Sequence, residues 1–91
     1  METKNAVVTS TLLGYEDHGI LTCQIFVNYD EHSSQGFGNR VLDIEYIKNI
    51  LSVFGVRKWE DLKGQFCRVG IKDDMIIQIG HVLNNNIWFD V

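Results

Sequence analysis

The chain has 91 residues, 45% of them apolar, and a formal net charge of −4. This length predicts a single domain over residues 1–91. The acidic balance disfavours broad binding to nucleic-acid phosphates, and no apolar run approaches the ~20 residues of a membrane helix. A chain this short buries only about 60–65% of its unfolded surface, so a homodimer is one assembly that would enlarge the core.

Both cysteines, Cys23 and Cys67, fall within alternating apolar residues, where free cysteines behave as small hydrophobes. The opening residues METKNAVVTS lack the basic start and the unbroken apolar stretch of a secretion signal. Two cysteines without such a signal favour a reducing compartment over a disulfide framework. We therefore expect a cytoplasmic protein.

The first half of the chain predicts a β-hairpin. Residues 5–14, NAVVTSTLLG, are rich in β-branched residues and predict a first strand. The sequence EDHG then supplies turn chemistry. Residues 20–29 alternate between apolar and polar side chains, which predicts the second strand.

A helical period follows, because apolar residues recur at Ile44, Ile47, Ile50, Leu51 and Phe54. Asp43 is a suitable N-cap for this helix, and Leu42 could pack onto Ile47. Gly55 is a suitable C′ residue, with Val56 folding back in a Schellman motif.

The remaining segments predict one helical turn and three strands. KWEDLKG, residues 58–64, reads as the turn, attached to the core by Trp59 and Leu62. Strands are expected at residues 65–71, 75–83 and 87–91, with left-handed asparagines in the turn at 84–86. The order ββαβββ implies an α+β fold, in which a curled antiparallel sheet of about five strands packs against one helix.

Two acid-histidine clusters have the ligand types of a metal site. The ten-residue strand between them spans roughly 33 Å, so the clusters should lie at opposite ends of the hairpin. A metal-dependent hydrolase is therefore a disfavoured alternative, and neither a catalytic residue nor a cofactor is expected. That alternative would use Asp17, His18, Asp30, His32 and His81.

The segment from Asp30 to Arg40 is expected to be the longest loop and the contact surface of a binding protein, since binding residues concentrate on loops. Phe37 either anchors this loop from inside, the favoured reading, or faces outward beside Arg40 as an interface residue. Its binding residues would be Asp30, His32, Gln35, Gly36, Phe37, Gly38 and Arg40.

GFG at residues 36–38 does not match the dinucleotide fingerprint, because Val41 stands where the third glycine should be. A glycine loop ahead of a helix can still present backbone N–H groups to an anion. An alternative function is thus the sequestration of an anionic nucleotide by the Gly36–Gly38 backbone and Arg40.

Several segments together resemble a family of small proteins encoded by bacteriophages and prophages, without a settled function. They are LLGYEDHGILT, SSQGFGNRVLD, WEDLKG, RVGI, IQIGH and WFD. The resemblance covers most of the chain and assigns no catalytic or binding residue. It implies an accessory protein in the cytoplasm of a bacterial host, acting on a host protein or a small anionic ligand, with inhibition of a host defence factor as an extension.

Overall fold

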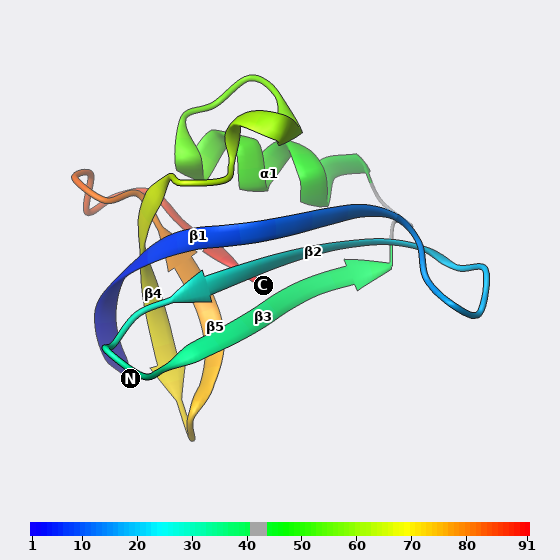
Figure 1. The fold of residues 1–91 in the computed structure, drawn as a ribbon. Coiled ribbons are helices and arrows are strands. Elements are labelled where there is room, and N and C mark those ends of the chain that lie inside the picture. The colour runs from blue at the N-terminus through cyan, green and yellow to red at the C-terminus, as the bar shows by residue number, and fades with distance from the viewer. Residues whose placement is uncertain (41–43) are drawn as a thin grey trace.

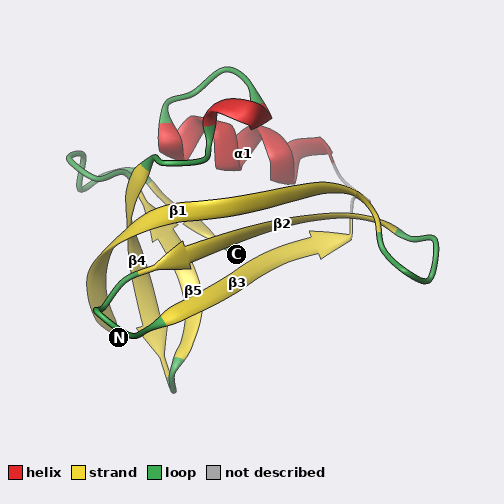
Figure 2. Ribbon diagram, in the orientation of Figure 1, coloured by secondary structure: helices red, strands yellow, loops and turns green. Residues whose placement is uncertain are grey.

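The computed structural model describes residues 1–40 and 44–91, with only the backbone described at 39 and 40. Six strands form one antiparallel sheet in the order β3-β2-β1-β4-β5-β6. The described residues contain one α-helix, which follows the third strand, and a 3₁₀ turn, η1, which follows the helix (Figures 1 and 2). The elements are β1 (Glu2–Tyr15), β2 (Leu21–Asn28), β3 (Ser34–Arg40), α1 (Ile44–Phe54), η1 (Trp59–Asp61), β4 (Phe66–Lys72), β5 (Met75–Gly80) and β6 (Trp88–Asp90).

The sheet curls because its long first strand, β1, pairs with two different strands along its length. Residues 2–7 of β1 pair with β4, whereas residues 7–15 pair with β2. A register shift between Val8 and Ser10 marks the change of partner, and a second shift lies between Gly70 and Ile71 in β4. Such bulges bend a strand and increase its twist. In Figure 1 the strands β4 and β5 accordingly cross steeply behind β1, β2 and β3.

The expected α+β class, with one helix on a curled antiparallel sheet, is confirmed. The strand count and the order ββαβββ were wrong in detail, because residues 34–40 form β3 where a loop was expected. Two glycines in seven residues hid this strand, since glycine is depleted in strands. Pairing with β2 from Asn28↔Ser34 to Thr22↔Arg40 overrides that local preference.

The core lies between the concave face of the sheet and α1. Ile50, Val53 and Phe54 are the buried residues of the helix, and Leu62 after η1 is fully buried beside them. The predicted Schellman ending is confirmed, because the Val56 N–H donates to the Leu51 carbonyl and Gly55 has a φ of 69°. The expected capping by Asp43 and packing of Leu42 lie outside the described residues. In the described part of the chain, no helix has the length and apolarity to cross a membrane.

Left-handed backbone occurs at an unexpected turn. The asparagines at 84–86 form a turn without it, whereas Asp73 and Asp74 adopt φ values of 52° and 65° between β4 and β5. Positive φ at both central residues is the pattern of a type I′ hairpin turn, which favours asparagine and glycine.

Replacing Asp74 with glycine should therefore raise the free energy of unfolding by about 1 kcal/mol, since the left-handed conformation costs an L-residue about that amount. Urea denaturation measures the change. Asp17→Gly is the matched control, because Asp17 also lies beside an acid in a hairpin turn but is not among the positive-φ residues. Equal stabilisation by both changes would attribute the gain to lost charge repulsion instead of backbone strain.

Two weakly acidic side-chain groups, the Cys67 thiol and the Tyr46 hydroxyl, should make the fold sensitive to alkali. Burial raises the pKa of Cys67 to about 12, and burial together with the nearby Cys23 raises the pKa of Tyr46 to about 12. The folded chain therefore keeps protons that the unfolded chain loses above about pH 8.5 for cysteine and pH 10 for tyrosine. Stability is fully present below these values and falls as the pH rises towards 12.

Urea midpoints at pH 8 and pH 11 test this expectation, and the midpoint should be lower at pH 11. Tyr46→Phe should reduce the difference, because it removes one of the two titrating groups. The Tyr46 hydroxyl is buried and has no hydrogen-bond partner among the described residues, so its removal leaves no group unpaired. An unchanged pH dependence in this variant would remove Tyr46 from the explanation.

Candidate interaction site

The two acid-histidine clusters lie at opposite ends of β2. His18 is in the turn between β1 and β2, and His32 is in the turn between β2 and β3. Within the described ranges, no group of three or more histidine, cysteine, aspartate or glutamate residues could hold a metal ion. The structure therefore does not bring the histidines of the two clusters together at one end of the hairpin.

His81 shapes the loop between β5 and β6. Its Nδ1 accepts hydrogen bonds from the backbone N–H groups of Leu83 and Asn84. Arg68 fastens the same loop through the carbonyls of His81 and Asn84 and the side chain of Asn85. The ring of His81 thus has a structural role.

The predicted binding residues at the start of the segment differ in their surroundings. Asp30 accepts a 2.6 Å ion-pair contact from Lys4, which raises the pKa of that lysine and joins the β2–β3 turn to β1. The His32 side chain is 94% exposed, and its contact in the turn is Glu31 at 4.0 Å. A binding role for either residue stays a prediction.

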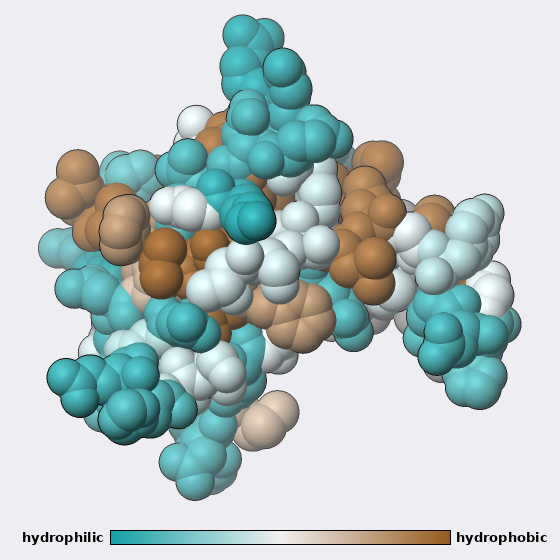
Figure 3. Space-filling model, in the orientation of Figure 1, coloured by the Kyte–Doolittle hydropathy of each residue, from teal (hydrophilic) through white to brown (hydrophobic). Residues whose placement is uncertain are grey.

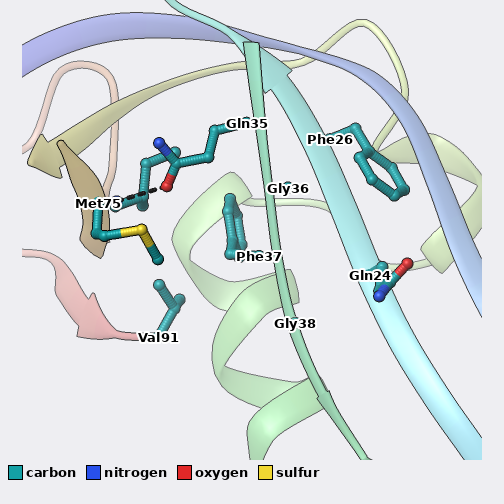
Figure 4. Close-up of a pocket in the computed structure, with 9 residues that line it drawn as sticks. Gln24, Phe26, Gln35, Gly36, Phe37, Gly38, Met75 and Val91 are labelled. Atoms are coloured by element: carbon teal, nitrogen blue, oxygen red, sulfur yellow. Dashed lines mark hydrogen bonds between the residues drawn. The ribbon is translucent and has the colours of Figure 1, made fainter.

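Gln35 connects β3 to the start of β5 across the gap between them. Its Oε1 accepts a 2.7 Å hydrogen bond from the Ile76 N–H, and its Nε2 donates to the Asp74 carbonyl at 2.9 Å. Figure 4 shows the side chain reaching from β3 towards β5. One amide group therefore substitutes for a peptide unit where these two strands meet.

A groove opens beside this bridge, with a volume of about 560 Å³. It is lined by residues 35–38 of β3, by Gln24 and Phe26 of the neighbouring strand β2, and across from these by Met75, Ile76 and Val91 (Figure 4). Met75 is 60% exposed, whereas Ile76 is buried. We call this depression the edge groove. It combines part of the predicted segment with a wall that is distant in sequence.

Phe37 takes the inward orientation. Its ring is 9% exposed and belongs to the core cluster, and it also reaches the groove. An outward-facing hot spot at this position is therefore not observed. The backbone of Arg40 lies at the end of β3, opposite Thr22, while its side chain is outside the described residues.

Each glycine of GFG is required by close packing. A Cβ on Gly36 would lie 2.7 Å from the Phe26 ring, and one on Gly38 would lie 2.0 Å from the Cys23 carbonyl oxygen. Neither glycine has a positive φ. The predicted anion-binding loop was wrong in its backbone, because these residues lie in a strand. The acids Asp73 and Asp74 beside the groove further disfavour an anionic ligand.

The backbone groups of these glycines face away from β2. The Tyr29 N–H donates to the Ser33 carbonyl, and the register continues without a shift through Val27↔Gln35 to Ile25↔Phe37. Because hydrogen-bonded and non-hydrogen-bonded pairs alternate in an antiparallel ladder, Gln35 and Phe37 bond to β2. Gly36 and Gly38 therefore direct their N–H and C=O groups outward, on a side where no described strand pairs with β3.

Sequence reasoning missed the second wall of the groove. Met75 and Val91 were assigned to strands and given no functional role. The exposed methionine directly after the acid pair was a weak signal, but Val91 reaches the groove only because β6 pairs with β5, where the Val91 N–H donates to the Ile77 carbonyl. Their position thus follows from the curl of the sheet.

The surface of the molecule is chemically mixed. Figure 3 shows polar residues over the β1–β2 turn at the right of the view and apolar residues gathered nearer the centre. Exposed apolar side chains of β1 and β2 include Leu12, Leu13 and Phe26.

Comparison with protein-family models, characterised proteins and solved structures found no significant match.

Proposed function

We propose that this protein is a non-enzymatic interaction module that binds another protein through the edge groove. The observation that carries the proposal is the juxtaposition of an unpaired strand edge with an apolar wall. Outward N–H and C=O groups of β3 can be hydrogen-bonded by a partner, and the exposed Met75 offers apolar surface beside them. Recognition that combines main-chain bonds with an apolar contact is typical of protein partners.

The resemblance to phage-encoded proteins supports a partner from the bacterial cell. Within this proposal the protein works in the cytoplasm of a phage-carrying bacterium and binds a host protein, with a defence factor as the target class. Its mode of action is occupation of a surface on that protein.

Affinity capture from bacterial lysate tests the proposal with two matched charge substitutions. Met75→Glu places a carboxylate in the groove, whereas Phe66→Glu places one at a residue of similar exposure, 63% against 60% for Met75, outside the groove. We expect the native protein and Phe66→Glu to retain the same partner and Met75→Glu to lose at least tenfold of it. Equal retention by both folded variants would contradict a role for the groove.

A further inference from the structure

We propose that the partner contributes an extended segment that pairs with the free edge of β3 and carries lysine or arginine at the end nearest the β4–β5 turn. This inference rests on the proposed function and specifies its mode of binding. The occupant is a strand of another protein, added beside Gly36 and Gly38 by main-chain hydrogen bonds.

The backbone geometry indicates a strand as the occupant. Gly36 and Gly38 direct their main-chain N–H and C=O groups outward. The main-chain groups of Phe37, between them, bond to β2. This alternation matches the spacing at which an added strand forms hydrogen bonds. Both glycines lack a side chain that could shield these groups from an approaching backbone, and both are exposed. Natural edges are commonly protected by charged side chains or proline, and neither stands at residues 34–38.

The side-chain requirements follow from the two faces of the added strand. Directly paired residues in neighbouring strands share one face of a sheet. A residue opposite Phe37 would therefore face inward, towards Met75 and Val91, and should be apolar. Its two neighbours would lie opposite the glycines on the outer face, where they meet solvent and the Phe26 ring.

The charge requirement comes from the Gln35 end of the groove. Asp74 is tied to Gln35 through its carbonyl, with Asp73 before it, and Asp30 and Glu31 lie in the turn that enters β3. Lys4 pairs with Asp30, and His32 lies 4.0 Å from Glu31. The acidic rim at this end therefore consists of Asp73 and Asp74, which follow Lys72 and directly precede Met75 of the groove. An acidic rim attracts a basic segment and repels an acidic one.

The test uses native protein and a synthetic ten-residue peptide of alternating valine and threonine, with two lysines at one end and a fluorescent label at the other. Fluorescence anisotropy measures its binding. Exchange of both lysines for glutamate should weaken binding at least tenfold. N-methylation of every second residue should abolish binding in one phase of the alternation and preserve it in the other, because only one set of N–H groups faces β3.

Two variants of one residue provide the matched protein control. Gly36→Pro removes an outward N–H without removing a bond to β2, and proline is tolerated on strand edges in this position. Gly36→Ala adds the same Cβ beside Phe26 but keeps the N–H. Any effect of the added Cβ is shared by the two variants, so we expect peptide binding to Gly36→Pro to be at least tenfold weaker than binding to Gly36→Ala.

Three results would overturn the inference. They are no binding of the basic peptide to native protein, equal binding by both N-methylated phases, and a concentration-dependent dimer that Gly36→Pro dissociates, which would assign the edge to a second copy of this chain. The N-methylated peptides keep the test decisive should Gly36→Pro fold poorly. If the peptide tests fail but Met75→Glu still loses the partner selectively, the groove remains the interface. Only the proposal of strand addition is then rejected.

Discussion

Replacing Gly38 with alanine should lower the free energy of unfolding by about 1–3 kcal/mol, the usual range for an added group in a closely packed position. The new methyl carbon would lie 2.0 Å from the Cys23 carbonyl oxygen and 2.8 Å from the Gln24 Cα. Both are backbone atoms of β2, so neither can rotate away. The strands β2 and β3 must separate locally, which weakens the ladder that holds the edge of the sheet.

Urea denaturation of Gly38→Ala, Gly36→Ala and Gly14→Ala measures this effect as a series. Alanine at 36 meets only the ring of Phe26, which can turn, and its cost should be smaller. Alanine at 14 has Leu12 at 4.0 Å as its nearest neighbour and should be neutral or slightly stabilising, since it restricts the unfolded chain. A Gly38→Ala protein as stable as Gly14→Ala would refute the close approach of β2 and β3.

The second large effect is expected at Leu62. Truncation of this residue to alanine should lower the free energy of unfolding by about 2–5 kcal/mol, because a cavity remains where its side chain was. Leu62 has no exposed surface and lies in the core with residues of α1 and of the sheet. It also follows η1 directly, so its side chain holds the connection between the helix and β4 against the core.

Thermal or urea unfolding of Leu62→Ala should be compared with Leu83→Ala. Leu83 is 83% exposed in the loop between β5 and β6, and its truncation should change the free energy of unfolding by less than about 0.5 kcal/mol. Similar losses in both variants would mean that Leu62 does not contribute as a core residue.

The elements that sequence reasoning recovered are those with a strong local signal. The helical spacing of the apolar residues of α1 and the glycine after its last turn can both be recognised from neighbouring residues. The Schellman hydrogen bond from the Val56 N–H to the Leu51 carbonyl follows from them. The alternation in residues 20–29 likewise predicted the strand β2, in which Cys23, Ile25 and Val27 are buried. Each of these features depends on residues that lie close together in the sequence.

The features that were missed depend on contacts across the sheet. Gly36 and Gly38 resemble loop residues until the positions of the Phe26 ring and the Cys23 carbonyl are known. The direction of their N–H groups requires the register between β2 and β3. The groove additionally requires the curl that brings Met75 to β3. No local pattern contains this information, because bulges and distant pairings determine it.

The division of β1 between two partners also has a kinetic consequence. Glu2 pairs with Ile71, so about three quarters of the 91-residue chain must be looped before this part of the ladder forms. Loop closure of this length is entropically unfavourable until many contacts compensate for it. During synthesis the first strand can pair with β2 as soon as the hairpin emerges, but its N-terminal half must wait for β4. We expect this waiting interval to be when the nascent chain is most prone to misassociation.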